Sequence, residues 1–389
     1  MNIEPVKGFL DFTGEEAIKR SKIKRIIENT FELNGFSPAE TPVIESEEFV
    51  LGDNPNDEAV SERYRLTDKG KRNLALRYEF TFQLKRLAIN KKLPFRRYQI
   101  GYVFRDEPVR CNRVRQITQC DIDIVGSTIK DEAEILKVFS ELLKKLKIEY
   151  SIYINNRKLL NEILEEFGIV QKEAVIREID KLDKLSKQEI KENLKKYNAE
   201  NILEIFTKPE KYFEKYNSYK EINELKKYCK EYGIEVEFLP FIARGLGYYN
   251  GNIFEIKTKK IKETICGGGS YLINQIQSTG ISVGIERLSI LADINTNIKR
   301  VLIISINEDK ESIKLSEKIK KNKIPSNVFY NKPSKALEYA NSYKIPFVVF
   351  VGENEVKSKK FKLKNMISGN GKFLSFKELI SEIKKIKDF

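Results

Sequence analysis

The sequence of 389 residues contains no histidine. This absence excludes every mechanism that uses an imidazole of the protein as base, nucleophile or metal ligand, including Ser-His-Asp and Cys-His machinery. Any catalysis must therefore rest on arginine, carboxylates, hydroxyls or a metal held by oxygen. Electrostatic work by arginine on phosphate groups is compatible with that list.

Cysteines are scarce, and long apolar runs are lacking. Cys111, Cys120, Cys229 and Cys266 are widely spaced and form no CxxC pair, so we expect reduced thiols rather than a disulfide framework or a zinc site. No segment reaches the roughly 18 to 20 apolar residues that span a bilayer, and the amino terminus lacks the charged-then-apolar order of a secretory signal. The sequence therefore predicts a cytoplasmic protein, and we assign none of its residues to a metal site.

Positive charge exceeds negative charge. The chain has 71 Lys and Arg against 57 Asp and Glu, a formal net charge of +14. Such an excess suggests a polyanionic partner, because bound cations release the counterions of phosphates. Most of the excess is lysine, however, and it accompanies abundant isoleucine and asparagine, as an AT-rich genome would also encode. Charge alone leaves nucleic-acid binding open.

The pattern of apolar residues divides the chain. With 41% hydrophobic residues, it can bury a large core, and its length favours roughly two or three domains. Residues 17–33 have amphipathic helical spacing, and residues 41–44 read as an extended run. From about 155 to 235, Lys, Glu, Leu and Ile recur at helical spacing, which predicts a helical insertion. Glycine-rich, strand-like sequence from 234 to 292 indicates that the first domain then resumes.

The last part of the chain alternates strands and helices. Strands are predicted at 301–305, 327–330 and 346–351, and helices near 310–320 and after Pro333. Ser375 and Glu378 form a capping-box pattern at the start of a final helix. This part is predicted to be a separate α/β domain of about 90 residues.

The segment from 96 to 126 is the most informative. Residues 98–105 and 116–125 read as two strands of a long hairpin, joined by a basic, irregular loop. Because side chains alternate along a strand, the polar residues of the second strand should share one face, opposite an apolar face. The polar set is Gln119, Asp121 and Asp123, and the opposite set is Thr118, Cys120, Ile122 and Ile124.

The loop of this hairpin gathers arginines around one carboxylate. They are Arg105, Arg110, Arg113 and Arg115, near Glu107. Planar guanidinium groups form forked hydrogen bonds with phosphate oxygens. From these residues alone, a hairpin with a solvated polar face and an arginine-rich turn is the simpler interpretation.

A resemblance to a known family favours a functional site in this hairpin instead. Residues 104–107 and 113–123 resemble the second signature motif of class II aminoacyl-tRNA synthetases, in its histidyl-tRNA synthetase form. Residues 76–81 resemble that family's acidic-and-threonine strand, 243–249 its histidine-binding motif, and 280–288 the third class II motif. Residues 35–45 are similar to the first motif, which forms the dimer interface in class II enzymes. Residues 351–355 and 362–366 are similar to the family's anticodon-binding domain.

The resemblance implies a multidomain fold of α+β and α/β parts. Residues 1–297 would form the class II catalytic domain around an antiparallel sheet, with the helical insertion at about 155–235, and residues 298–389 a small α/β anticodon-binding domain. The implied activity is that of a histidine–tRNA ligase, which activates histidine with ATP and transfers it from the adenylate to tRNA(His). ATP and Mg2+ would be the cofactors, and the enzyme would be a homodimer.

For ATP, the resemblance implies four residues. Arg105 would hold the α-phosphate as a catalytic residue, and Glu107 would lie near the adenine amino group. Arg113 would contact the outer phosphates, and Arg287 would stack on the adenine. A guanidinium can grip an oxyanion or lie flat on a base, whereas lysine cannot do both.

For the amino acid, the resemblance implies carboxylates for the α-ammonium group and the imidazole, tyrosines that line the pocket, and a catalytic arginine between the two substrates. The set is Glu79, Thr81, Gln119, Asp123, Arg244, Tyr248 and Tyr249. Arg244 would act where charge develops in the transition state, and Gly245 and Gly247 would permit close backbone approach. From the residues alone, the two tyrosines could instead be packed core residues.

Some positions depart from the family pattern. The family usually has Asp at the position of Gly247, and Arg and Asp at those of Ser270 and Leu272, so charged groups near the pocket are lost. Tyr78 with Asp123 is closer to the archaeal and eukaryotic form. A synthetase-like regulatory paralogue and a second class II specificity are the alternatives; the retained arginines and the carboxy-terminal domain favour the enzyme.

Overall fold

The structure is a computed structural model that describes residues 3–52, 58–109, 113–183, 185–244, 247–296 and 300–385. The chain forms two compact units, one made of residues 1–12 and 20–293 and the other of residues 13–19 and 294–389. Arg110, Cys111, Gly245 and the predicted boundary near 297 lie outside the described residues. In the described part, no helix is long and apolar enough to cross a membrane.

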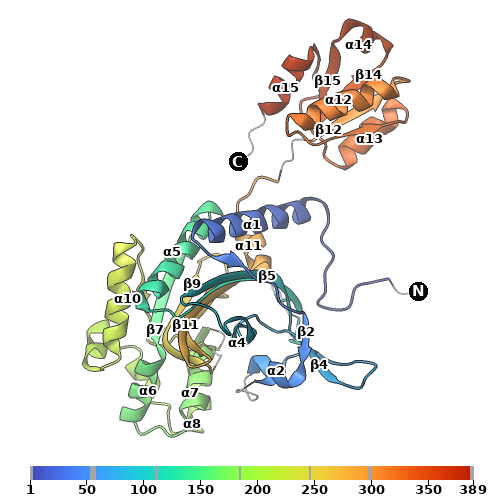
Figure 1. Ribbon diagram of the computed structural model, residues 1–389. Coiled ribbons are helices and arrows are strands. Elements are labelled where there is room, and N and C mark those ends of the chain that lie inside the picture. Colours follow the sequence, from blue (N-terminus) through green and yellow to red (C-terminus); the bar gives the residue numbers. More distant parts are fainter. Residues whose placement is uncertain are drawn as a thin grey trace. The chain divides into compact units, whose positions relative to one another are not determined.

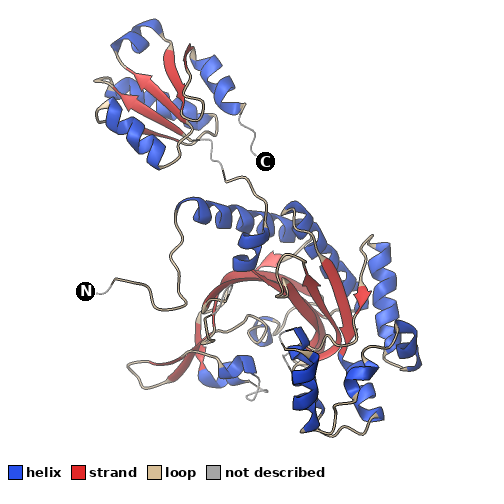
Figure 2. Cartoon of the chain, turned by 180° about the vertical axis from the view of Figure 1, so that it is seen from behind, coloured by secondary structure: helices blue, strands red, loops and turns tan. Residues whose placement is uncertain are grey.

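The larger unit is built on a curved eight-stranded sheet, which Figures 1 and 2 show from opposite sides. Its central strands are antiparallel, and only the edge strands β1 and β8 pair in parallel. In spatial order the strands are β1 (Ser37–Pro38), β5 (Phe95–Phe104), β6 (Gln116–Val125), β11 (Ile276–Gly284), β10 (Cys266–Ile273), β9 (Tyr249–Lys257), β7 (Ser151–Asn156) and β8 (Glu237–Phe238). The predicted hairpin is confirmed, because β5 and β6 pair along their whole lengths.

Helices cover the outer face of this sheet (Figure 1). They are α1 (Gly14–Leu33), α5 (Ile129–Lys145), α11 (Ile285–Leu291) and α10 (Tyr219–Glu231), which packs on α5. The amphipathic pattern of α1 places Ile23, Ile27 and Phe31 in the core. The ring of Phe31 lies 5.8 Å from that of Phe139 of α5, so the two helices share one apolar layer.

A small sheet and three short helices lie between α1 and β5 in the sequence. They are β2 (Ile44–Ser46), α2 (Glu47–Leu51), α3 (Glu58–Ser61), β3 (Arg65–Thr67), β4 (Asn73–Leu76) and α4 (Leu84–Leu87). The extended run predicted at 41–44 is wrong except at Ile44. The carbonyl oxygens of Thr41 and Pro42 accept hydrogen bonds from the side chains of Arg77 and Gln83, at 2.7 and 2.9 Å, instead of pairing with a strand.

The helical segment leaves the sheet after β7 and returns to it at β8 and β9. Its further elements are α6 (Arg157–Glu166), α7 (Lys172–Ile179), η1 (Asp180–Asp183), α8 (Lys187–Lys195), α9 (Ile202–Ile205) and η2 (Glu210–Lys215). Asn156 ends β7 and caps α6, because its side chain accepts a hydrogen bond from the backbone N–H of Lys158. Strands from both sides of the segment therefore belong to one sheet.

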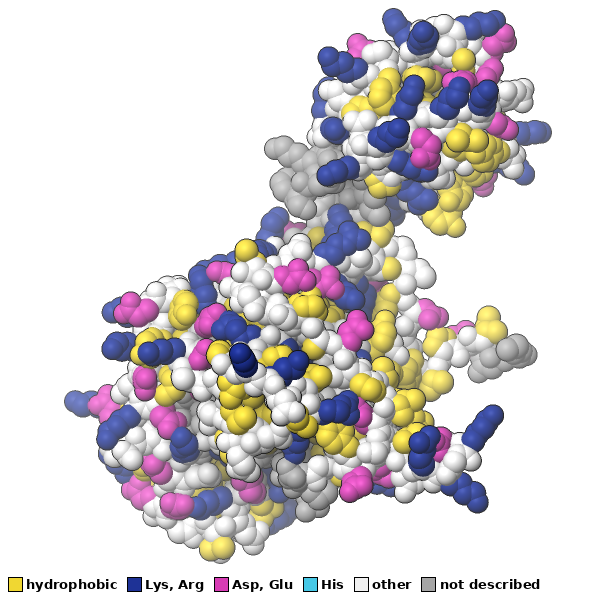
Figure 3. Space-filling model, viewed as in Figure 1, with side chains coloured by type: hydrophobic (Ala, Val, Ile, Leu, Met, Phe, Trp, Pro, Cys, Tyr) yellow, Lys and Arg dark blue, Asp and Glu magenta, His cyan; other side chains and the backbone are white. Residues whose placement is uncertain are grey.

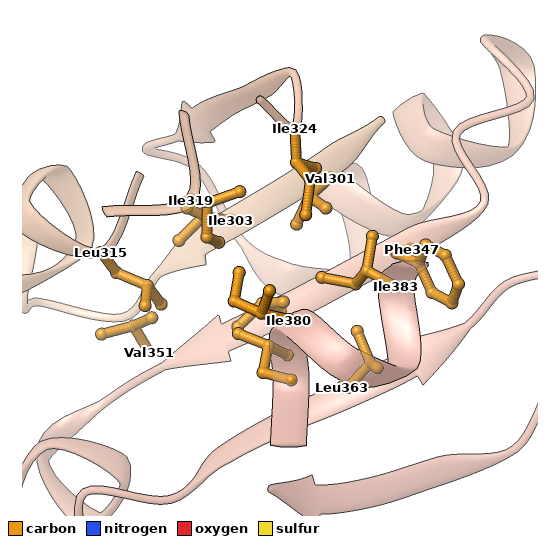
Figure 4. Packing of buried hydrophobic residues seen from close by; sticks show 12 residues of the cluster. Val301, Ile303, Leu315, Ile319, Ile324, Phe347, Val351, Leu363, Ile380 and Ile383 are labelled. Atoms are coloured by element: carbon orange, nitrogen blue, oxygen red, sulfur yellow. The ribbon is translucent and has the colours of Figure 1, made fainter. Parts of the chain in front are cut away.

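The smaller unit is a five-stranded sheet in the order β13-β12-β14-β15-β16 with helices on both faces. Its elements are β12 (Val301–Ser305), α12 (Asp309–Lys321), β13 (Ser326–Phe329), α13 (Pro333–Ser342), β14 (Phe347–Val351), α14 (Glu353–Ser358), β15 (Phe361–Asn365), β16 (Gly371–Leu374) and α15 (Phe376–Lys384). Figure 4 shows one of its two cores, where Ile303 of β12 lies near Ile319 of α12 and Ile380 of α15. The predicted capping box of Ser375 and Glu378 is confirmed.

Candidate active site

The polar face of β6 is buried. Gln119, Asp121 and Asp123 are 7%, 4% and 3% exposed, and Asp123 lies opposite Arg97 on β5 and Gly280 on β11. The predicted alternation is confirmed, because Cys120, Ile122 and Ile124 are fully buried on the other side. The solvated-face interpretation of this hairpin is therefore wrong, and the acidic groups must have partners inside the protein.

Arg97 compensates this acidic face. Its Nη2 lies 2.7 Å from Oδ2 of Asp123, and both side chains are almost fully buried. Burial raises the pKa of Asp123, although Arg97 opposes the shift. Burial and the neighbouring Asp123 raise the pKa of Asp121 well above its usual value. Arg97 therefore favours the charged form of Asp123, while burial and the neighbouring Asp123 favour the neutral form of Asp121.

Tyr271 completes this cluster from β10, since its hydroxyl donates a hydrogen bond to Oδ1 of Asp123. A glycine is required opposite Asp123. A Cβ on Gly280 would lie 2.2 Å from Oδ1 of Asp123 and 2.7 Å from the hydroxyl oxygen of Tyr271. Sequence reasoning missed Arg97 and Tyr271 as site residues, although strand alternation from the paired positions would have placed them on this face.

The other residues predicted for amino-acid binding lie beside this cluster. Glu79 is 4% exposed and accepts a hydrogen bond of 3.3 Å from the hydroxyl of Tyr248, to which Thr81 also hydrogen-bonds. The rings of Tyr248 and Tyr249 lie 4.7 Å apart, and that of Tyr248 lies 5.5 Å from Tyr271. Distant segments of the sequence therefore form one buried cluster of acids and tyrosines.

A cleft of about 150 Å³ lies beside this cluster and gathers arginines from four places in the chain. Gln119 lines the cleft and donates a hydrogen bond of 2.9 Å to Asp121 of the cluster. Its charged and polar lining residues include Arg105, Glu107, Arg113, Gln119, Arg244, Glu286 and Arg287. Nη1 of Arg113 lies 2.6 Å from Oε2 of Glu107, and Nη1 of Arg105 lies 3.8 Å from Oε1 of the same residue. All four residues predicted for ATP are thus brought together.

The cleft has a surplus of positive charge. Burial and the neighbouring Arg113, Arg105 and Arg244 lower the pKa of Arg287. Its Nη1 donates a hydrogen bond to the carbonyl oxygen of Thr264, which brings no countercharge. Converging guanidinium groups in a partly desolvated cleft favour an anion with several oxygens, such as a triphosphate.

Arg244 lines the cleft and also hydrogen-bonds to Tyr249 of the buried cluster. Its φ of +55° lies in the left-handed region, which costs a non-glycine residue about 1 kcal/mol or more. Its Nη1 lies 3.1 Å from Oε1 of Glu255 on β9. Burial would raise the pKa of Glu255, but Arg244 and Lys257 hold that pKa below its usual value, so the carboxylate stays ionised. A Cβ on Gly267 would lie 2.3 Å from Nη1 of Arg244, so the guanidinium lies flat against a bare strand.

The departures from the family pattern have different consequences. Ser270 and Leu272 do not border the pocket as expected, because on β10 they alternate with Tyr271 and face away from it. The hydroxyl of Ser270 donates to Oε1 of Glu132 on α5, and Leu272 is 43% exposed. Gly247 does lie near the site, and a Cβ there would be 4.0 Å from Oε2 of Glu173 on α7.

Glu132 is a buried acid beneath the sheet that the sequence did not single out. It accepts hydrogen bonds from Ser270 and, at 2.7 Å, from Asn252. Burial raises its pKa from 4.5 to about 7. A chain without histidine thus still contains a group that titrates near neutrality.

We expect Glu132→Gln to raise the free energy of unfolding at pH 8 by about 2 to 3 kcal/mol and to have little effect near pH 5. Because the pKa of Glu132 is higher in the folded protein than in the unfolded chain, where it is 4.5, protonation of Glu132 favours the folded state. This stabilisation is complete below about pH 4.5 and is lost as the pH rises through about 7. The neutral glutamine removes that dependence. Urea unfolding of both proteins at the two pH values measures the effect, and an equal difference at both would contradict the assignment.

Comparisons with known proteins agree with this geometry. The family described as Histidyl-tRNA synthetase matches residues 8–288, and that described as Anticodon binding domain matches residues 300–386. Histidine–tRNA ligase 1 of Bacillus cereus is 34% identical over 412 residues, covering 95% of this chain and 94% of that relative. Histidine–tRNA ligase of Helicobacter pylori is 34% identical over 432 residues, covering 97% and 98%.

Two solved structures share the fold. Histidyl-tRNA synthetase from Nostoc sp. PCC 7120 has a TM-score of 0.85 at 24% identity, covering 99% of each chain. An ATP phosphoribosyltransferase regulatory subunit/histidyl-tRNA synthetase from Bacillus halodurans has a TM-score of 0.75 at 20% identity, covering 90% of this chain and 98% of that one.

The mostly antiparallel sheet has the fold of these solved structures, and its arginine cleft lies beside a buried acidic cluster. Together with the family match over residues 8–288, this arrangement identifies a class II aminoacyl-tRNA synthetase. Within that class, the match over residues 8–288 and the relatives that cover almost the whole chain are decisive. The chain belongs to the histidyl-tRNA synthetase family.

Proposed function

We propose that this protein is a histidine–tRNA ligase. It would convert histidine and ATP into histidyl-adenylate and pyrophosphate, and then transfer the histidyl group to tRNA(His) with release of AMP. The observation that carries the proposal is the arginine cleft beside the buried cluster of Asp123, with Gln119 lining the cleft and hydrogen-bonded to Asp121 of that cluster. Such a site can hold a triphosphate and a small cationic or polar side chain side by side, which is the arrangement that adenylate formation needs.

In the cleft, Arg105 would hold the α-phosphate, Arg113 the outer phosphates, and Arg287 the adenine ring. Glu107 would accept a hydrogen bond from the adenine amino group. Among the described residues, no group of three or more Asp, Glu or Cys side chains could hold a metal ion. Mg2+ would therefore come with ATP, held chiefly by phosphate oxygens, as is usual for this ion.

In the pocket, Glu79, Thr81 and Gln119 would bind the α-ammonium group of histidine. Asp123 would accept a hydrogen bond from the imidazole, and Tyr248 and Tyr249 would line the side-chain pocket. The ion pair with Arg97 supports this role, because the guanidinium favours the charged carboxylate and opposes the upward effect of burial on the pKa of Asp123. Arg244 would stabilise the charge that develops between the carboxylate of histidine and the α-phosphate.

An ATP–pyrophosphate exchange assay across all common amino acids tests the proposal. We expect exchange with histidine and none above background with the others. Exchange with a different amino acid would indicate another class II specificity. Absence of exchange with every amino acid would favour the regulatory alternative, although retention of Arg244 and of the carboxy-terminal unit supports the enzyme.

The smaller unit is proposed to bind the anticodon region of the tRNA. Figure 3 shows Lys and Arg side chains spread over one face of this unit among fewer acidic ones. Its two separate cores indicate that it folds around its own sheet. Phosphates of RNA are the natural partners of such a surface.

Removing the chain from residue 298 onward should leave the rate of histidine activation within about twofold of the parent rate. The rate of tRNA charging should fall by at least about tenfold, because one of two linked RNA contacts is lost. All the proposed ATP and histidine residues lie before this point. Pyrophosphate exchange and aminoacylation assays on the same preparation measure the two steps. An equal loss of both activities would contradict the assignment of activation to the larger unit and of tRNA binding to the smaller unit.

A homodimer and a cytoplasmic location complete the proposal. Val43, Ile44 and Leu66 are 38%, 49% and 38% exposed, close to the segment that resembles the first class II motif. Neighbouring exposed apolar side chains are typical of protein interfaces. Sedimentation at micromolar concentration tests the dimer, and a monomer would contradict it.

A further inference from the structure

The segment before Arg244 has no regular secondary structure, yet its backbone is held in place by side chains from the start of the helical segment. Asn155, at the end of β7, donates two hydrogen bonds of 2.9 Å through Nδ2, to the carbonyl oxygens of Pro240 and Ile242. Asn155 is fully buried, and within the described part of the chain its Oδ1 has no hydrogen-bond partner. The side chain is thus oriented by the two carbonyl groups that it binds.

Arg157, the first residue of α6, continues this series. Its Nη1 lies 3.5 Å from the carbonyl oxygen of Ala243, the residue directly before Arg244. Its Nη2 donates a hydrogen bond of 2.5 Å to Oε2 of Glu173 on α7. The Arg157 side chain is only 4% exposed, whereas that of Glu173 is 58% exposed. Glu173 therefore supplies, from the helical segment, the countercharge that fixes a buried guanidinium.

We propose that Glu173 is a positioning residue for Arg244. Through Arg157 and the carbonyl group of Ala243, it holds the backbone that presents the Arg244 guanidinium to Glu255 and Gly267. Arg244 needs such support because its left-handed φ of +55° is unfavourable for a residue with a side chain. A small rotation of this backbone displaces the guanidinium at the far end of a long side chain. The helical segment thereby sets the geometry of the catalytic centre. This role of Glu173 in catalysis rests on the proposed activity.

The variant Glu173→Gln tests the proposal, because it removes the charge and keeps the shape of a half-exposed side chain. The matched control is Glu192→Gln on α8, which breaks the exposed ion pair with Lys195 in the same helical segment. We expect Glu173→Gln to lower kcat of histidine-dependent exchange by about tenfold, with the KM values for ATP and histidine nearly unchanged. In an Arg244→Ala background, the same substitution should cause no further loss, since its effect acts through Arg244.

A second measurement does not depend on amino-acid activation. Amide hydrogen exchange of residues 239–244, which include the hydrogen bond from the Ile242 N–H to the Leu239 carbonyl oxygen, should be faster in Glu173→Gln than in Glu192→Gln. Unchanged protection of this segment would overturn the proposal, as would a tenfold loss that persists in the Arg244→Ala background. A parent protein without histidine-dependent exchange would refute the proposed function, while hydrogen exchange would still decide the role of Glu173.

Discussion

Replacing Arg244 by alanine is expected to lower the rate of histidine-dependent pyrophosphate exchange by about two to three orders of magnitude, the usual effect of losing one preorganised transition-state donor. Binding of histidine should suffer less, because Asp123 and Tyr271 are untouched. The fold should survive, since Glu255 keeps Lys257 at 3.1 Å and accepts a hydrogen bond of 3.0 Å from Thr264. Steady-state exchange kinetics with varied histidine and ATP measure the effect.

Arg96→Ala provides a matched control for this variant. Arg96 also lies near the catalytic sheet, but it pairs with Glu134 of α5 on the outer face, at 2.5 Å. Its loss should leave exchange near the parent rate. If Arg244→Ala also stayed near that rate, Arg244 would be a structural residue and the catalytic assignment would be wrong.

Replacing Asp123 by alanine should have the second large effect, on both stability and activity. Arg97 would remain buried, and its remaining polar contacts in the described part of the chain would include Gln99 Oε1 at 3.5 Å and the Phe80 carbonyl oxygen at 3.4 Å. Removing one partner of a buried ion pair lowers the free energy of unfolding by about 3 to 5 kcal/mol, because the other charge stays buried without its partner. Exchange with histidine should fall by about two orders of magnitude or more, because a charged hydrogen bond to the substrate is lost.

A paired variant separates these two effects. Changing both Arg97 and Asp123 to leucine removes the unpaired charge and should recover much of the stability, as apolar replacement of buried pairs often does. Histidine activation should stay lost. Asp293→Ala, at an acid whose side chain is 81% exposed, is the control for both measurements. Recovery of histidine exchange in the paired variant would show that Asp123 serves the fold and does not read the substrate.

Local sequence patterns were sufficient for several elements. The alternation of residues 301–351 predicted β12, α12, β13, α13 and β14 of the smaller unit, because each of these short elements has an apolar face that its own sequence displays. The hairpin of β5 and β6 was predicted for the same reason. The elements α14, β15 and β16 were not predicted. The run at 41–44 failed because Arg77 and Gln83, more than 30 positions later, take its carbonyl groups as partners.

The family resemblance placed the candidate residues, but it did not indicate what supports them. Arg105, Arg113, Arg244 and Arg287 were singled out from their motifs, and they do line one cleft. Their catalytic and binding roles stay predictions. The family motifs do not include the supporting residues Glu255, Glu132 and Asn155. The sequence therefore indicated only that these residues lie on an expected strand or helix, and not that they support the site.

The sequence by itself determined many of the strands and helices, such as β5, β6 and β12, the polar face of β6, and the family that the motifs resemble, because propensity, alternation and motif spacing are local properties. The tertiary structure alone decided that the polar face is buried, that Arg97 neutralises it, and that Ser270 faces away from the pocket. These facts depend on partners such as Asp123 and Tyr271, which are 148 positions apart and meet only when the sheet brings β6 and β10 to either side of β11. The charge of a buried carboxylate depends on such neighbours in space, since burial and nearby ions set its pKa.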